Sequence, residues 1–258
     1  MKILLTNDDG IYAKGLWALY DRLSMKHSLT IVAPASEKSA VGHGLTLHRP
    51  LRVKNTEIFK NKWGYSVNGT PVDCIKLSIL EILNEKPDMV ISGINPGANT
   101  GVNINYSGTV AAAREAALYG ITSIAVSMQG KKPEHYDDAA AFIEKLAENI
   151  YKKPPLLGTV INVNIPDLPK HMIAGTKIIR QSMKHPEEYV KKNVDPRGSS
   201  YFWHGINSKL NGSDPDSDED VLLRNYIAIT PVKCDTTDYS IIDEMNNWEI
   251  DKCLGTAR

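Results

Sequence analysis

Short apolar runs that end at turn-forming residues constrain the fold of this chain more than any other feature. Five such runs, rich in Ile, Leu and Val, cover residues 2–6, 29–33, 89–92, 123–126 and 160–163. Continuous apolar runs of this length are typical of parallel strands that are buried on both faces. The segments between them favour helices, so the sequence predicts a Rossmann-like α/β fold: a mostly parallel sheet with helices on both faces.

The expected helices lie between these strands. They are centred on residues 72–83, 109–119 and 136–150, and a first helix carries Leu16, Leu19, Tyr20 and Leu23 at helical spacing. Residues 51–67 hold two strand-like pieces around Asn61-Lys62, which predicts a hairpin insertion. The pattern becomes irregular near residue 180, and residues 198–203 and 226–230 are expected as strands of an antiparallel appendage. We therefore expect a catalytic core at 1–180 and a C-terminal extension at 181–258 whose hairpin packs back on the core.

Charge and cysteine content narrow the class of protein. The 258 residues carry 30 basic and 30 acidic side chains, and this balance argues against nucleic acid as a partner. Three scattered cysteines, Cys74, Cys234 and Cys253, predict a reducing compartment and no disulfide framework. Neither a secretory leader nor an apolar run long enough to span a bilayer is recognisable, so a cytoplasmic protein without a membrane partner is expected.

Three polar loops follow predicted strands, at residues 7–10, 35–39 and 93–97. In an open α/β sheet, ligands bind outside the carboxyl ends of the strands, where the strand order reverses. We therefore expect the three loops to meet. Two close carboxylates, Asp8 and Asp9, would repel each other unless a cation lies between them. Together with Ser39 and Asn95 they form a hard oxygen set that favours Mg²⁺, Mn²⁺ or Ca²⁺ over zinc, although Asn-Asp-Asp-Gly by itself is also ordinary turn chemistry.

Ser107, Gly108 and Thr109 precede an alanine-rich segment in which a helix should begin. Free amides at a helix start, beside a glycine, suit a phosphate group. The alternative is a simple N-cap, which any helix can have. Thr70, Pro71 and Asp73 form a similar helix start that a capping box explains without a ligand.

Several other motifs carry less weight. His43 has no zinc-like partner spacing and is expected to be structural. The acidic run 214–218 lacks the glycine and the last acid of a calcium loop, so it is interpreted as an exposed loop. No glycine fingerprint follows the first strand, which disfavours a Rossmann oxidoreductase.

Taken together, the motifs resemble the survival protein SurE family of 5'/3'-nucleotidases. The matching stretches are LLTNDDGIYAKGL, SAVGHGLTLHRPL, NGTPVDCIKLSI, PDMVISGINPGANTG, YSGTVAAAREAALYGITSIAVS, VDPRGSSYFW and ITPV. They occur in the family order and span nearly the whole chain, which makes the series specific although each motif alone is weak. Pro96, residues 184–193 and the tail after Asp235 depart from the family pattern.

The resemblance implies hydrolysis of nucleoside 5'- and 3'-monophosphates, a phosphoric monoester hydrolase activity of the 5'-nucleotidase type, with short polyphosphate as a further substrate. It implies one divalent cation per subunit, Mg²⁺ or Mn²⁺, held by Asp8, Asp9, Ser39 and Asn95. It also implies a phosphate pocket at Ser107, Gly108 and Thr109, with Asn95 beside it, and a homodimer or homotetramer to which the C-terminal extension contributes.

The expected reaction is direct hydrolysis, in which Asp8 or Asp9 orients the attacking water and Ser107 stabilises charge on the phosphoryl oxygens. A phosphorylated Asp8 is the competing chemistry. A non-catalytic nucleotide sensor with the same fold is the alternative function, and a phosphate-release assay separates it from an enzyme.

Overall fold

A nine-stranded mixed sheet forms the centre of the computed structural model, which describes residues 1–59, 61–185, 187–206 and 214–254. The strand order is β3-β4-β2-β1-β5-β6-β7-β11-β8. The five strands expected from the apolar runs are β1 (Lys2–Thr6), β2 (Ser28–Pro34), β5 (Met89–Pro96), β6 (Thr122–Met128) and β7 (Thr159–Ile165). Each pairs in parallel with its neighbour among these five, which confirms the predicted α/β class.

Helices cover both faces of this sheet. The α-helices are α1 (Lys14–Leu23), α2 (Pro71–Leu77), α3 (Gly108–Leu118), α4 (Tyr136–Tyr151), α5 (Asp218–Leu223) and α6 (Ile242–Asn246). A π-helical turn (Ser78–Ile82) continues α2, and 3-10 helices lie at Gly101–Asn105, Lys170–Met172, Tyr239–Ile241 and Ile250–Leu254. None of these helices in the described part of the chain is both long and apolar enough to cross a bilayer.

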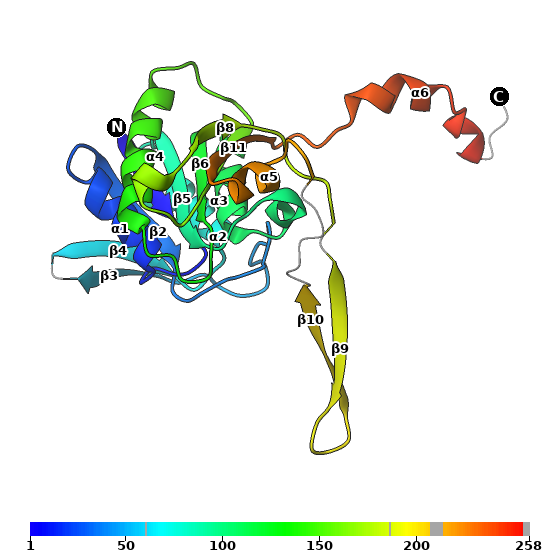
Figure 1. Cartoon of the computed structure of the whole chain (residues 1–258), viewed down its shortest axis with the longest axis horizontal. Helices are drawn as coiled ribbons and strands as arrows, with labels where there is room; N and C mark the ends of the chain where they lie inside the picture. Colours follow the sequence, from blue (N-terminus) through cyan, green and yellow to red (C-terminus); the bar gives the residue numbers. More distant parts are fainter. Residues whose placement is uncertain (60, 186, 207–213, 255–258) are drawn as a thin grey trace.

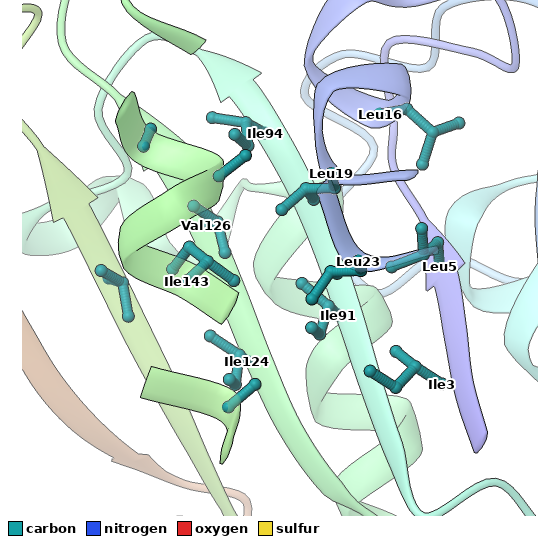
Figure 2. Close-up of a cluster of buried hydrophobic side chains, with 14 of the residues drawn as sticks. Ile3, Leu5, Leu16, Leu19, Leu23, Ile91, Ile94, Ile124, Val126 and Ile143 are labelled. Atoms are coloured by element: carbon teal, nitrogen blue, oxygen red, sulfur yellow. The ribbon is translucent and has the colours of Figure 1, made fainter. Parts of the chain in front are cut away.

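The core is divided between the two faces of the sheet. On one face, α1 and α4 bury Leu16, Leu19 and Ile143 against strand residues such as Ile91 and Ile124 (Figure 2). On the other face, α2 and α3 pack against β1, β2 and β5. Truncating one of these buried leucines or isoleucines to alanine typically costs about 2–5 kcal/mol. The packing of helices on both faces therefore holds the sheet rigidly, and this fixes the positions at which its strands end.

The hairpin insertion is present as β3 (Val53–Phe59) and β4 (Lys62–Val67), and β4 extends the sheet by pairing in parallel with β2. The C-terminal half differs from the expectation. Strand β11 (Tyr226–Lys233) lies inside the main sheet, antiparallel to β7 and parallel to β8 (Gly175–Ile178). The prediction that residues 226–230 form a strand of a separate appendage is therefore wrong. Burial of Ile227 and Ala228 explains this placement, since both need a packed neighbour.

A second hairpin stands apart from this sheet. Strands β9 (Glu188–Val194) and β10 (Ser200–Ile206) pair with each other in antiparallel fashion and project from the body of the molecule (Figure 1). We call this β9–β10 pair the hairpin arm. Strand β10 overlaps the predicted strand at 198–203, whereas β8 and β9 were not predicted.

Strand β1 marks the point at which the strand order reverses. It pairs with β2 on one side and with β5 on the other, so the chain proceeds from β1 in opposite directions along the sheet. The carboxyl ends of β1, β2 and β5 consequently meet at one edge, which is where ligand sites of open α/β sheets lie.

Candidate functional site

A pocket of about 520 Å³ opens at this edge of the sheet. It is lined by the side chains that the sequence singled out on the three loops and at the start of α3: Asp8, Asp9, Ser39, Asn95 and Ser107. The expected convergence of the three loops is confirmed. Gly108 and Thr109 are absent from the lining among the described residues; both are buried and contact Asp8.

Asn7 and Gly10 close the turn that follows β1. The side-chain nitrogen Nδ2 of Asn7 donates to the Gly10 carbonyl oxygen at 2.9 Å, and the backbone N–H of Gly10 donates back to Asn7 Oδ1 at 3.2 Å. Gly10 has a φ of +101°, which side chains rarely adopt. Asp8 and Asp9, which would point to opposite faces of a regular strand, both line the pocket as a result. The turn interpretation and the site interpretation of Asn-Asp-Asp-Gly are thus compatible, because the turn carries the two pocket carboxylates.

The two carboxylates lie in an environment that disfavours their charge. Burial raises the pKa of Asp8 above its ordinary range. Burial, followed by the neighbouring charges of Asp8 and Glu37, raises the pKa of Asp9 to about 7. The Oδ2 atom of Asp9 is buried and has no hydrogen-bond partner among the described residues. Buried polar atoms are normally paired, so this oxygen and the mutual repulsion fit a bound cation.

The other two side chains expected to hold the cation, Ser39 and Asn95, are neutral. No group of three or more His, Cys, Asp or Glu side chains in the described ranges is arranged to hold a metal. Asn95 directs its amide nitrogen to the Gly97 carbonyl oxygen at 2.7 Å, which leaves its own carbonyl oxygen for a ligand. Ser39 lines the same pocket and donates its hydroxyl hydrogen to Glu37 Oε1 at 2.5 Å. An all-oxygen set of this kind fits Mg²⁺ or Mn²⁺.

A break in strand pairing brings Asn95 to the pocket. The register between β5 and β6 shifts between Ser92 and Asn95. Gly93 sits in this break with a φ of +139°, and a Cβ added there would lie 2.3 Å from the Val126 carbonyl oxygen. Irregularities of this type re-aim side chains near functional sites. The glycine is needed because the chain passes too close to β6 for any side chain.

The start of α3 contacts Asp8 directly. Ser107 is the N-cap, and its hydroxyl oxygen accepts from the Val110 amide at 3.1 Å, as the capping interpretation expected. Thr109 is fully buried and donates its hydroxyl hydrogen to Asp8 Oδ1. A Cβ on Gly108 would lie 2.8 Å from the Cβ of Asp8. Ser107 therefore serves as a cap and also faces the pocket, whereas phosphate binding by Gly108 and Thr109 stays a prediction.

An ion-pair cluster holds the Ser39 loop against α3. His43 Nε2 lies 2.7 Å from Glu115 Oε2, and Lys76 Nζ lies 2.8 Å from Glu115 Oε1. The hydrogen bond from His43 is the main reason that the pKa of Glu115 is lowered despite burial. The Gly42 amide also donates to the Tyr106 carbonyl oxygen at 3.0 Å. His43 thus has the structural contacts expected of it.

Several pocket residues were given no role in the sequence analysis: Glu37, Asn99, Asn103, Tyr106 and Lys131. Lys131 is the one basic side chain among the described residues of the lining. It follows β6 at the same edge of the sheet, so the strand-end criterion that found Asn95 could also have found Lys131. Asn99 is held in place by Asn164 and Ser127, at 2.7 Å each, and no local sequence signal announces such a network.

Comparisons with known proteins identify relatives of this chain over nearly its whole length. The family model of "Survival protein SurE" matches residues 3–188. A protein of Desulfatibacillum aliphaticivorans named 5'-nucleotidase SurE is 48% identical over 98% of this chain and 100% of its own length. A protein of the same name from Syntrophobacter fumaroxidans is 45% identical over 97% of this chain and 100% of its own length.

A solved structure extends the likeness to three dimensions. The crystal structure of the SurE protein from Aquifex aeolicus superposes with a TM-score of 0.85 at 34% identity, covering 96% of this chain and 100% of that one. The shared fold includes the main sheet and the C-terminal half, since nearly the whole of both chains is aligned. On these grounds the chain belongs to the survival protein SurE family.

Proposed function

We propose that this chain is a metal-dependent phosphatase that hydrolyses nucleoside 5'- and 3'-monophosphates to nucleoside and phosphate. The observation that carries the proposal is the Asp8–Asp9 pair, which lines a pocket together with the N-cap of α3. A pocket of about 520 Å³ is within the size range of small-molecule sites. Relatives that bear the name 5'-nucleotidase SurE support a nucleotide substrate.

The same proposal includes one divalent cation per subunit, Mg²⁺ or Mn²⁺. Asp8, Asp9, Ser39 and Asn95 would hold it, and the orphaned Oδ2 of Asp9 supports this assignment. Such a cation supplies Lewis-acid polarisation of a phosphoryl oxygen and neutralises the repulsion between the carboxylates and the phosphate.

The side chains around the pocket have distinct tasks in this reaction. Asp8 or Asp9 orients the attacking water and accepts its proton. Ser107 donates its hydroxyl hydrogen to a phosphoryl oxygen, since its own oxygen already accepts from Val110. Gly108, Thr109 and Asn95 complete the proposed phosphate-binding set, and Lys131 adds a positive charge.

Attack by water is proposed in preference to a phosphorylated Asp8. The Thr109 hydroxyl occupies Oδ1 of Asp8, and the Gly108 backbone packs against this side chain, which restricts its approach to phosphorus. Rapid acid quenching during turnover of radiolabelled substrate tests this point. Radiolabel retained on Asp8 would overturn direct hydrolysis.

Further parts of the proposal concern assembly, location and substrate range. The hairpin arm supports a homodimer or homotetramer, because an isolated two-stranded hairpin is rarely stable in water. The free thiols Cys74, Cys234 and Cys253 support a cytoplasmic location. Short polyphosphate is a further proposed substrate, and the positive charge of Lys131 in the pocket supports it.

A paired measurement separates this enzyme from a nucleotide sensor. Equilibrium binding of AMP and release of phosphate from AMP are measured on the same protein sample with Mg²⁺ or Mn²⁺ present. Release that depends on the cation supports the phosphatase. Binding of AMP without release in any of these conditions would establish the sensor instead.

A further inference from the structure

Asp218 occupies a position that the acidic run 214–218 did not predict. The run was interpreted as an exposed loop, and Asp216 is indeed exposed, but Asp218 at the start of α5 is fully buried. Its Oδ2 accepts from the Gly101 amide at 2.9 Å. Its Oδ1 accepts from the amides of Ser182 and Glu219, each at 2.9 Å. Three backbone donors on one buried carboxylate are the compensation that such a charge requires.

Gly101 begins a segment that forms one wall of the pocket. The 3-10 helix Gly101–Asn105 contains Asn103, and Tyr106 follows it; both side chains line the pocket. Gly101 is held on both sides, because its carbonyl oxygen accepts from Gln181 Nε2 at 2.8 Å while its amide donates to Asp218. A Cβ at Gly101 would lie 2.6 Å from Oε1 of Glu219, a side chain of α5, so α5 also contacts this segment through a side chain.

The same contacts join the two roots of the hairpin arm, the segments 180–182 and 214–218 on either side of it. Arg180 forms two hydrogen bonds to the Asp214 carboxylate, at 2.9 and 2.7 Å. The Asp218 amide donates to the Arg180 carbonyl oxygen at 3.0 Å. The Ser182–Asp218 hydrogen bond is a further contact between these two segments. Both ends of the arm thus contact the residue that begins the pocket wall.

We propose that Asp218 is a positioning residue for the nucleotide site: it fixes the wall formed by Asn103 and Tyr106 and couples that wall to the roots of the hairpin arm. The inference rests on the proposed function for the identity of the ligand. Asp218 is not among the described residues of the pocket lining, so it acts through Gly101 rather than on the substrate. A displacement of the arm roots would move the wall, while the Asp8–Asp9 end of the pocket would keep its geometry.

The test compares Asp218→Asn with Asp216→Asn in the full chain. The two substitutions remove the same charge two residues apart, and Asp216 has a φ of 54° that asparagine tolerates. In Asp218→Asn an amide group faces three amide donors and cannot accept from all of them. Hydrogen exchange in peptides that cover residues 99–106 should accelerate about tenfold, the equivalent of one lost hydrogen bond to a charged group. Asp216→Asn should exchange as the native protein does.

Steady-state kinetics with AMP provide the second readout. The KM of Asp218→Asn should rise by about fivefold or more while kcat stays within about twofold, because the wall binds substrate and the reacting groups are untouched. Gln181→Ala, which removes the milder contact to Gly101, should shift exchange and KM in the same direction by less. It also keeps the test decisive should Asp218→Asn fail to fold.

Two results would overturn the inference. One is native exchange at residues 99–106 in folded Asp218→Asn, or in Gln181→Ala where the first variant does not fold. The other is an equal acceleration across the whole chain, which marks a residue that only stabilises the fold. Absence of turnover by the native protein would instead count against the proposed function, and the exchange result would still decide the role of Asp218.

Discussion

Thr109 donates its hydroxyl hydrogen to Oδ1 of Asp8, although 101 positions separate the two residues in the sequence. The contact joins the first residues of α3 to the end of β1. It fixes one carboxylate oxygen and leaves the rest of the Asp8–Asp9 pair directed to the pocket. The geometry of the proposed cation site therefore depends on α3 as well as on the turn after β1.

Replacement of Thr109 by valine keeps the volume of the side chain but leaves Asp8 Oδ1 without its partner. The cost should be about 1–3 kcal/mol of stability, the usual penalty for an unsatisfied buried polar group, and weaker cation binding should accompany it. Urea unfolding and a Mn²⁺ titration check both effects. Thr230→Val is the matched control, because the Thr230 hydroxyl is buried without a described partner and its loss should be neutral or stabilising. Equal stability losses in the two variants would contradict the account.

Gly108→Ala should impair activity far more than stability. Alanine is favoured over glycine in helices by about 1 kcal/mol, yet the new Cβ would lie 2.8 Å from the Cβ of Asp8 and must displace that carboxylate. Phosphate release from AMP should fall by about a hundredfold, as misplacements of order 1 Å typically cause. Denaturant unfolding of the same variant is the control, and native-like activity would exclude a close packing of Gly108 on Asp8.

Without a cation, the raised pKa of Asp9 should make the protein less stable as the pH rises. The pKa is about 7 in the folded protein against an ordinary value of 3.8, so the folded state binds this proton more tightly than the unfolded state does. The contribution of Asp9 to the free energy of unfolding is therefore fully present below about pH 4, and it is lost as the pH rises through about 7.

Thermal unfolding of chelator-treated protein from about pH 5 to about pH 8 measures this dependence. Asp9→Asn should flatten the part of the profile that Asp9 causes, and added Mg²⁺ should restore stability most at the upper end. Identical pH profiles for the native protein and Asp9→Asn would refute the assigned shift.

Lys131→Gln should raise the KM for AMP by roughly tenfold, because the variant loses one charge-assisted contact to the phosphate group. Lys132→Gln is the matched control, since Lys132 carries the same charge one position further along but is absent from the described lining of this pocket. Initial rates at several AMP concentrations separate KM from kcat. An equal effect of the two substitutions on KM would contradict a direct contact between Lys131 and the phosphate group, because it would show that only the overall positive charge matters.

The sequence predicted the parts of the fold that have a strong local signal. Buried apolar runs identified β1 and β5, and the capping box identified by Thr70 and Asp73 begins α2 as expected. Strand β8 is short and mostly exposed, and β9 is largely exposed on the hairpin arm, so neither has the apolar pattern of a core strand. The placement of β11 depends on the strands with which it pairs, β7 and β8, and no local sequence pattern identifies these partners.

The candidate site was predictable to the extent that topology alone determines it. Asp8, Ser39 and Asn95 were found because they follow strands of one parallel sheet, and their convergence required no detail of packing. Asn99 and Asp218 were not found, because their positions result from hydrogen bonds to residues far away in the sequence. Long-range polar contacts of this kind leave no spacing that a single sequence reveals.

The most direct test of the proposed function is phosphate release by chelator-stripped protein after Mg²⁺ or Mn²⁺ is added back. AMP, GMP and 3'-AMP serve as substrates, and an Asp8→Asn/Asp9→Asn double variant serves as the comparison. The account predicts that the native protein releases phosphate only with the cation and that the double variant is slower by a factor of at least about 10³, the scale of lost electrostatic catalysis. Equal release by the folded double variant, or no release by the native protein with any of these substrates and cations, would contradict it.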